Sequence, residues 1–348
     1  MISVQDRSLR LLESAQKIQR PFELDESLCL YSPQDNVDSL QHPRIVDWID
    51  FVKNRYEPKL PKAKRRILLF MPCTKTKPYP FSSEHKAINQ RILNSGFKPI
   101  ERLYLPQELQ ARLEPEFSQE VLNLSALSDG KGTVIHRMVI SEPLGIVPYE
   151  HIASYLGRAS PASAYDDPGL FEKRGNAASP WRKDCTAVQV SPTRWSWGDE
   201  ERRCYVTMHN AMAEIVAAVL SRIGKQYTDV VSWVAPGLTH RSFVISRKER
   251  RPNKVALGKL AGGERLPLIG ANDLLPEEQA IECLPTLDQC KAAVERLAHR
   301  LGTDITKAKG VYSRGGANAT PLALPELLDV LIECLTASPE AKKIGKAA

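Results

Sequence analysis

The sequence predicts an α/β fold with a largely parallel sheet, flanking helices, and helical N- and C-terminal extensions. Three short apolar runs, at residues 67–71, 134–141 and 229–234, are bounded by charges, glycine or proline and indicate buried strands. Segments with apolar residues at helical spacing lie between these runs. Strands that alternate with helices favour parallel pairing, and this alternation predicts the fold class.

The first expected elements are helices. Residues 5–20 place leucines among charges, and residues 42–56 repeat apolar side chains at helical spacing. Pro58 ends the second of these segments. The basic stretch KLPKAKRR at 59–66 is a linker that leads into the first strand.

The next elements surround the second strand. A helix is expected at 86–94, and the strand leaves through a Pro/Gly turn at 142–148. Residues 157–197 are crowded with Pro, Ser, Asp and Trp, and a connection of this length in a compact domain is often functional. Residues 200–223 carry a broad apolar face and predict the longest helix.

The last third of the chain is expected to be mostly helical. Residues 239–246 predict a further strand, which precedes helices at 276–284 and 287–301. A glycine-rich link and a final helix near 322–335 follow. The expected parts are a helical extension over 1–65, an α/β domain over 66–270 and a helical C-terminal region over 271–348.

The composition is that of a soluble globular protein, which we expect in the cytoplasm. Hydrophobic residues make up 42% of the 348 residues and charged residues 26%, which argues against wholesale disorder. No run approaches the roughly 20 uninterrupted apolar residues of a membrane helix, so no membrane partner is expected. The N-terminal segment has charges where a signal peptide has its apolar stretch. The seven cysteines include no CxxC pair, and we expect neither a metal site nor a cofactor.

The chain is basic, and its positive charge is concentrated. Lys and Arg (48) exceed Asp and Glu (41), which gives a formal net charge of +7. This excess favours a polyanionic partner, because Lys and Arg neutralise phosphates. Dense clusters lie at 59–66 and 246–254. The alternative is that both clusters are solvated linkers.

Three strand exits bring polar residues to one edge of the predicted sheet. They are MPC at 71–73, EPLG at 142–145 and APGLTH at 235–240. Ligands of open α/β sheets bind beyond the carboxyl ends of the strands, and parallel strands place these ends at the same edge. The sequence therefore predicts a single site built from the three exits.

The first exit carries a candidate nucleophile. Cys73 follows a buried strand and precedes Lys75 and Lys77. Ammonium groups beside a thiol lower its pKa and favour the thiolate, which attacks electrophilic carbon. In the alternative interpretation, Cys73 is a small buried hydrophobic residue and the lysines are solvated.

The first two exits resemble a known family. PCTKTKPYPFSSEH at 72–85 is similar to the PC-x3-KPY-x2-S-x2-H signature of the archaeosine synthase catalytic domain. PLGIVP at 143–148, followed by Tyr165 and Asp166, resembles the SPLGLVP … YD stretch of that family. The resemblance covers residues 66–167, so that the α/β domain is expected to be catalytic.

The resemblance implies chemistry on a nitrile. Archaeosine synthase acts on 7-cyano-7-deazaguanine in tRNA and joins the ε-amine of lysine to the nitrile carbon. By analogy, Cys73 attacks this carbon to form a thioimide, and the nitrogen takes a proton from one of three candidate donors, His85, Asp166 and Glu142. A carboxyl group must be buried to remain protonated for this role. The residues expected to contact the substrate are Lys77, Tyr79, Ser82, Leu144, Gly145, Tyr165, His240 and Arg241.

The chain also departs from the family. Glu142 stands where members carry Ser or Thr, and DPG at 167–169 replaces a PVTG element. Archaeosine synthases typically carry a transglycosylase-like region before the motif and a tRNA-binding PUA domain after it, and we identify neither. These departures favour the related enzymes that hydrolyse the nitrile of the same base in bacterial DNA to a carboxamide.

Three functions follow from this reasoning. The preferred one is hydrolysis of the nitrile within nucleic acid, with DNA favoured over tRNA and with a transglycosylase that inserts the base as a further partner. The second is transfer of lysine to the nitrile in tRNA. The third is a non-catalytic nucleic-acid-binding component of a modification system.

Aromatic and basic residues outside the motif are candidates for nucleic-acid contact. Tryptophans interleaved with cations suit an extruded base, which stacks on a ring while its backbone meets positive charge. The alternative is that the tryptophans anchor the core. The candidates are Lys75, Arg182, Lys183, Trp195, Trp197, Lys248, Arg250 and Arg251.

Overall fold

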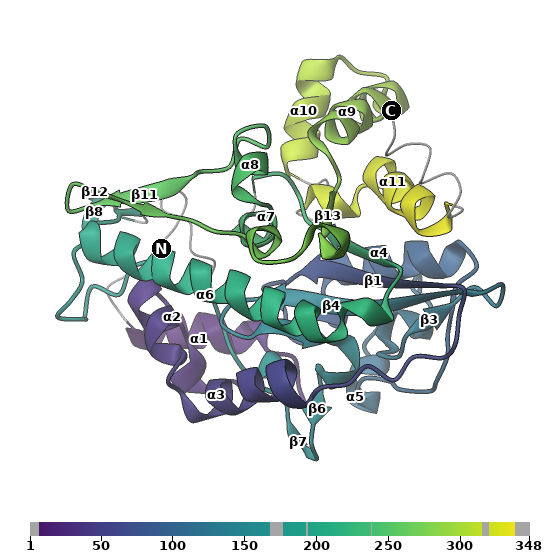
Figure 1. The fold of residues 1–348 in the computed structure, drawn as a ribbon, viewed down its shortest axis with the longest axis horizontal. Coiled ribbons are helices and arrows are strands. Elements are labelled where there is room, and N and C mark those ends of the chain that lie inside the picture. The colour runs from purple at the N-terminus through teal and green to yellow at the C-terminus, as the bar shows by residue number, and fades with distance from the viewer. Residues whose placement is uncertain (1–6, 168–176, 193, 238, 315–319, 338–348) are drawn as a thin grey trace.

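A mostly parallel sheet organises the chain (Figure 1). The computed structural model describes residues 7–167, 177–192, 194–237, 239–314 and 320–337. The strands of the sheet are β1 (Arg65–Pro72), β2 (Lys98–Pro99), β3 (Leu127–Ser128), β4 (Thr133–Ser141), β5 (Gly145–Pro148), β10 (Asp229–Trp233) and β13 (Glu282–Leu284). Their order is β13-β10-β1-β4-β3-β2, and β5 pairs with β4 outside this path.

The parallel part of the sheet is its centre. β1 pairs in parallel with β4 and with β10, and β10 pairs in parallel with β13. The shorter strands β2, β3 and β5 pair antiparallel. The predicted α/β class with a largely parallel sheet, flanking helices and terminal helices is confirmed.

Helices cover both sides of the sheet. The view of Figure 1 places α6 and the first three helices below the sheet, and α4, α9 and α11 above it. The helices are α1 (Arg7–Lys17), α2 (Pro33–Ser39), α3 (Pro43–Asp50), α4 (Ser83–Asn94), α5 (Gln107–Gln110), α6 (Asp199–Ile223), α7 (Thr239–Val244), α8 (Arg247–Arg250), α9 (Leu287–Leu301), α10 (Ile305–Arg314) and α11 (Pro325–Thr336). In the described part of the chain, no helix has the length and apolar character needed to cross a membrane.

Three small hairpins project from this framework. The β8–β9 and β11–β12 hairpins lie near the N-terminal end of α6 in Figure 1. The paired strands are β6 (Ser154–Tyr155) with β7 (Arg158–Ala159), β8 (Val188–Ser191) with β9 (Arg194–Ser196), and β11 (Gly258–Ala261) with β12 (Glu264–Pro267).

The start of β1 is tied to the end of the chain by one buried arginine. The Arg65 guanidinium lies 2.9 Å from Asp229 Oδ2 and donates to the carbonyl oxygens of Leu335 and Ala337 at 2.7 and 2.9 Å. A cation is stabilising at the C-terminus of a helix, where carbonyl groups lack partners. Arg65 therefore fixes α11 to the sheet.

One hydrophobic core joins the three parts expected from the sequence. The core contains residues from Leu28 to Leu335. The sheet also crosses the expected boundary at residue 270, because β13 pairs with β10 through Val231 and Glu282. The N-terminal and C-terminal segments therefore pack on the same sheet as the segment between them.

Two of the sequence-based predictions are wrong. Of residues 239–246, expected as a strand, Thr239–Val244 form helix α7, which packs against α6 and buries Phe243 and Val244. β-branched composition is only a weak predictor of strands where tertiary packing decides. Residues 276–284, expected as a helix, form one 3-10 turn and then β13. Leu284 precedes Pro285, and a residue before proline disfavours helical backbone.

Some elements were not predicted. α2 and α10 fall in segments for which no particular element was expected, and β5 lies in the expected Pro/Gly turn at 142–148 and forms a hairpin with β4. Residues 168–169, Leu238 and the glycines of the link at 315–319 lie outside the described residues.

A substitution at Gly145 tests how closely this hairpin packs on α6. Its φ is +72°, and an added Cβ would lie 2.4 Å from Ile215 Cγ2. Gly145→Ala should lower the free energy of unfolding by about 2–5 kcal/mol, because left-handed backbone strain and overpacking add. Chemical denaturation measures this change.

Gly130→Ala is the matched control. Gly130 also has a positive φ (+67°) but has open space where the Cβ would lie. Gly130→Ala should lower the free energy of unfolding by only about 1–2 kcal/mol, which is the cost of placing alanine in left-handed backbone. Equal losses in the two variants would contradict the packing argument.

Candidate active site

The exit of β1 fixes the position of Cys73. The Cys73 N–H donates to Ile140 O at 3.1 Å, which continues the pairing with β4 by one residue. The carbonyl of the preceding Pro72 accepts from His85 Nε2 at 3.0 Å. The backbone on both sides of the thiol is thus held, while the Cys73 side chain keeps part of its surface exposed.

The thiol is paired with an imidazole. Cys73 Sγ lies 3.2 Å from Nε2 of His240, the second residue of α7. Burial lowers the pKa of His240 to about 4 and raises the pKa of the Cys73 thiol. At neutral pH the pair is therefore a thiol in hydrogen-bond contact with a neutral imidazole. This arrangement suits a nucleophile that loses its proton to an adjacent base during attack.

Lys77 is buried beside this pair. Its ammonium donates to Thr74 O and lies 4.5 Å from the ring centre of Tyr165. Burial lowers the pKa of Lys77, and its charge is the main influence that opposes the rise in the pKa of Cys73. Lys75 points to solvent. The expectation of a lowered thiol pKa is corrected, because desolvation outweighs the one lysine that lies close.

Three hydroxyl groups form a cluster next to the thiol. Tyr79 Oη lies 3.1 Å from Ser141 Oγ and 2.8 Å from Tyr165 Oη, and Tyr165 also bonds to Ser141. The Ser141 hydroxyl interacts with Cys73 and lowers the pKa of the thiol. Burial raises the pKa of both tyrosines, so these groups remain neutral donors.

Glu142 is a buried carboxyl group whose pKa is raised. It is buried where β4 ends, and its Oε1 has no hydrogen-bond partner among the described residues. Burial raises the pKa of Glu142 well above its ordinary range, and the neighbouring Asp167 and Cys73 raise it further. A carboxylic acid that is neutral at pH 7 can donate a proton. Of the three expected proton donors, Glu142 has the electrostatics that this role requires.

The other two expected donors have structural partners. Asp166 Oδ2 accepts from Lys17 Nζ and Ser14 Oγ, both at 2.6 Å, and so anchors α1. His85 lies between Pro72 O and Tyr149 Oη, the latter 2.6 Å from its Nδ1. Burial lowers the pKa of His85 to about 4. These contacts give Asp166 and His85 structural roles, and Asp166 Oδ1 has no partner among the described residues, so the assignment of either residue as a proton donor stays a prediction.

Several expected substrate contacts also serve the fold. Ser82 caps α4, since its Oγ accepts from the His85 N–H at 3.2 Å. Leu144 is fully buried, and its carbonyl accepts from Trp48 Nε1 at 3.1 Å. The expectation that Ser82 and the Leu144 side chain contact substrate is therefore corrected.

Three arginines expected to bind nucleic acid or substrate already have hydrogen-bond or ion-pair partners within the protein. Arg182 pairs with Asp35, Asp38 and Asp184 at 2.8–2.9 Å. Arg241 is buried and donates to Val234 O and Pro285 O. Arg250 is buried and donates to Ser242 O and Ala256 O. Because these guanidinium groups already bind protein, we correct the expectation that Arg182 and Arg250 contact nucleic acid and that Arg241 contacts substrate.

The tryptophans of the long loop are core residues. Trp195 and Trp197 are 7% and 3% exposed, and Trp197 Nε1 donates to Ala177 O at 2.7 Å. Neither ring has a face open for a base, which corrects the stacking prediction. Four of the expected nucleic-acid contacts are exposed: Lys75, Lys183, Lys248 and Arg251.

Two residues near Cys73, Glu84 and Ser141, were not expected at the site from the sequence. Glu84 lies in the first turn of α4, and burial raises its pKa to about 7. Its one sequence signal is its place inside the motif, two residues after the capping Ser82. Ser141 is the last residue of β4, so its position at the strand exit follows from where the strand ends.

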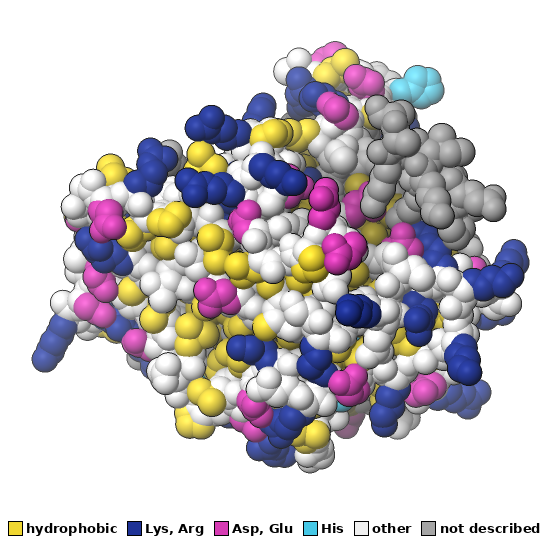
Figure 2. Space-filling model, viewed as in Figure 1, with side chains coloured by type: hydrophobic (Ala, Val, Ile, Leu, Met, Phe, Trp, Pro, Cys, Tyr) yellow, Lys and Arg dark blue, Asp and Glu magenta, His cyan; other side chains and the backbone are white. Residues whose placement is uncertain are grey.

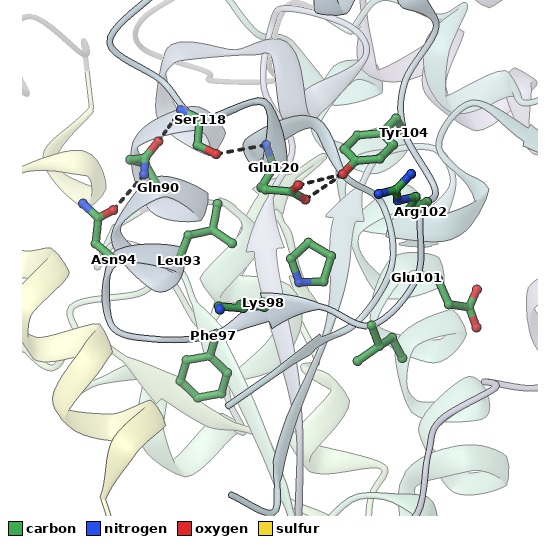
Figure 3. Close-up of a pocket in the computed structure, with 12 residues that line it drawn as sticks. Gln90, Leu93, Asn94, Phe97, Lys98, Glu101, Arg102, Tyr104, Ser118 and Glu120 are labelled. Atoms are coloured by element: carbon green, nitrogen blue, oxygen red, sulfur yellow. Dashed lines mark hydrogen bonds between the residues drawn. The ribbon is translucent and has the colours of Figure 1, made fainter. Parts of the chain in front are cut away.

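Two cavities lie away from this site. The larger, of about 580 Å³, is shown in Figure 3 and lies beside the second half of α4 and β2. Tyr104 lines it, and its hydroxyl group donates to the Glu120 carboxylate, whose two oxygens both lie at 2.8 Å. The smaller, of about 320 Å³, lies between Arg7 and Trp181. Neither is lined by Cys73, and across the described ranges no three His, Cys, Asp or Glu residues gather in a way that could hold a metal ion.

Comparison with family models, curated proteins and solved structures found no match to this chain. The interpretation of the site therefore depends on its own geometry and on the motif resemblance.

The neutral state of the thiol can be tested directly. Iodoacetamide reacts with the thiolate, so its reaction with Cys73 should be slow at pH 7 and should rise only above the ordinary thiol pKa of about 8.5. Lys77→Met should slow the reaction further at each pH, because it removes the charge that stabilises the thiolate. Mass spectrometry with peptide mapping resolves Cys73 from the other cysteines.

Lys75→Met is the control, because Lys75 is exposed. It should leave the pH profile of Cys73 unchanged. An alkylation profile with a midpoint at or below pH 7 in the wild type would contradict the account of the thiol.

Proposed function

We propose that this protein is an enzyme that hydrolyses the nitrile of 7-cyano-7-deazaguanine within nucleic acid, with Cys73 as the nucleophile. The observation that carries the proposal is the 3.2 Å contact between Cys73 Sγ and His240 Nε2 at a buried strand exit. The raised pKa of the buried Glu142 carboxyl and the resemblance of residues 72–85 to archaeosine synthases support it. A nitrile carbon is an electrophile that a thiolate attacks, and its nitrogen then needs a proton.

The first step forms the thioimide. The thiol proton of Cys73 moves to His240 Nε2 as sulfur bonds to the nitrile carbon. One π-electron pair of the C≡N bond moves to nitrogen, which takes the proton of Glu142. The products are a C(=NH)–S adduct, an imidazolium and a carboxylate, so charge is conserved. The ammonium of Lys77 lies close enough to stabilise negative charge on sulfur during attack.

The second step releases the amide. Water attacks the thioimide carbon and gives one proton to the Glu142 carboxylate, while the imidazolium of His240 protonates the nitrogen. The tetrahedral intermediate then loses the C–S bond, and its hydroxyl proton passes through His240 to the leaving sulfur. The net change is addition of one water to the nitrile, and all three side chains return to their first state.

A basic surface supports nucleic acid as the carrier of the base. Figure 2 shows Lys and Arg side chains over α8 and the β11–β12 hairpin. The exposed members are Arg247, Lys248, Arg251, Lys254 and Arg265. With the net charge of +7, this surface favours phosphates. We propose DNA before tRNA as the carrier, a transglycosylase that inserts the base as a partner, and the cytoplasm as the location.

The reaction is tested by mass spectrometry of oligonucleotides that contain 7-cyano-7-deazaguanine, in DNA and RNA forms. We expect the DNA product to gain the mass of one water, and Cys73→Ser to abolish the gain and the covalent adduct. Cys185→Ser is the control, since Cys185 lies outside the site.

Added lysine separates the alternatives. A product that gains lysine would replace hydrolysis by amidine formation. Unchanged oligonucleotide that remains bound would contradict an enzyme and favour a binding component. Full activity of Cys73→Ser would contradict the thioimide route.

The basic surface predicts the salt dependence of binding. Lys248→Ala and Arg251→Ala should each weaken binding of the oligonucleotide and lower the slope of log K against log salt by about 1. Lys131→Ala, in the turn before β4 at the opposite edge of the sheet, should change neither quantity. Equal slopes in all variants would place the phosphate contacts elsewhere.

A further inference from the structure

We infer that α8, the β8–β9 hairpin and the β11–β12 hairpin form a duplex-opening surface, in which Leu260 enters the base stack of double-stranded nucleic acid while cations around it hold the phosphates. This inference deepens the proposed function and rests on it in one respect, that the carrier of the substrate is nucleic acid. It adds that the carrier is a duplex and that the protein itself extrudes the base.

The β11–β12 hairpin has two different faces, because successive residues of a strand point to opposite sides. Its inner face carries Lys259, whose ammonium lies 5.7 and 5.1 Å from the ring centres of Trp197 and Tyr205. Its outer face carries Leu260 and Arg265, which lie opposite each other in the strand pairing. Both are exposed, Leu260 to 59%. The hairpin therefore holds an apolar side chain in solvent directly beside a cation.

The β8–β9 hairpin extends this outer surface. Trp197 directly follows β9, and Leu266 of β12 packs against the hydrophobic cluster that contains Trp197, so the two hairpins lie side by side, as Figure 1 shows. Val188 and Val190 of β8 are 66% and 52% exposed. A single exposed apolar residue is ordinary, but three on adjoining hairpins favour a surface that a partner covers.

The charge around these apolar side chains is complementary to nucleic acid. Figure 2 shows hydrophobic side chains among Lys and Arg side chains over α8 and the β11–β12 hairpin. Within the described ranges, the five exposed cations of this surface have no ion-pair partner, so they are available to phosphates: Arg247, Lys248, Arg251, Lys254 and Arg265.

A buried arginine joins this surface to the candidate active site. Arg250 of α8 donates to Ser242 O at 2.7 Å, and to Ala256 O, just before β11, at 3.0 Å. Ser242 belongs to α7, the helix that also carries His240, whose Nε2 lies 3.2 Å from Cys73 Sγ. A duplex bound to α8 and the hairpin is therefore held in a fixed position relative to the thiol.

The position of Cys73 requires the base to leave the duplex. The thiol lies at a strand exit beside His240, and enzymes whose reactive group cannot enter a duplex extrude the target base. Proteins that unstack bases commonly insert apolar side chains, leucine among them, between base steps. Gly262 and Gly263, with φ of +58° and +79°, close the β11–β12 hairpin with a tight two-residue turn, which fixes Leu260 for this role.

Fluorescence of 2-aminopurine tests the opening without any turnover. The probe is a duplex in which 2-aminopurine neighbours a single 7-cyano-7-deazaguanine, and the protein carries Cys73→Ser. Binding should raise the fluorescence, because 2-aminopurine brightens when it is unstacked. Leu260→Ser in the same background should remove most of this rise and change the affinity by less than about threefold, because phosphate contacts dominate affinity.

Leu156→Ser is the matched control. Leu156 is 53% exposed and lies at the turn of the β6–β7 hairpin, which Figure 1 places far from α8. The neighbouring Arg158 is paired with Asp47 at 2.7 Å, so this hairpin lacks an available cation beside its leucine. Leu156→Ser should keep the full rise in fluorescence.

Hydrolysis by protein that retains Cys73 gives a second readout. Leu260→Ser should lower kcat/KM on the duplex by about tenfold and leave kcat/KM on the single strand unchanged, because a single strand needs no opening. A mismatch opposite the target base should restore the activity of Leu260→Ser, because an unpaired base is extruded at lower cost.

The outcomes separate this inference from the proposed function. A fluorescence rise that persists in Leu260→Ser, equal losses on duplex and single strand, or binding to single strands alone would overturn the duplex-opening surface even if the wild type hydrolyses the nitrile. A rise that Leu260→Ser removes and Leu156→Ser keeps supports the surface even if no nitrile product forms, in which case the proposed reaction is wrong.

Discussion

The parallel pairing of β1 between β4 and β10 is the constraint on which the rest of the site depends. Parallel strands have their carboxyl ends at the same edge of the sheet. Cys73, which follows β1, and Glu142, which follows β4, are therefore brought together by the strand pairing itself. β10 delivers the chain to α7, whose second residue is His240. Antiparallel pairing would place these groups at opposite ends of the sheet.

Burial then decides the charge states at this edge. Desolvation raises the pKa of Cys73 and Glu142 and lowers the pKa of His240 and Lys77. The Cys73 thiol and the His240 imidazole are therefore uncharged at rest, and charge develops on them only when a proton moves. Fixed dipoles and a nearby ammonium stabilise such developing charge better than water does, because they need little reorganisation.

Sequence patterns predicted the central strands, the long α6 and the three exits, because buried runs and helical spacing are local signals. They also placed Cys73 and Glu142 in one site. They failed for α7 and β13, where packing against α6 and pairing with β10 override local preference. They could not show that the guanidinium groups of Arg241 and Arg250 donate to backbone carbonyl groups. A basic residue looks the same in the sequence whether its side chain is exposed or buried.

The contact of Thr320 with Glu84 has a consequence for synthesis of the chain. The first helix, through Lys17, and the segment before α11, through Thr320, both contact the edge that holds Cys73. Ribosomes add roughly 5–20 residues per second and release the N-terminal part first. The nascent chain therefore carries Cys73 without its imidazole partner at least until His240 has emerged, and the contact of Thr320 with Glu84 forms later still.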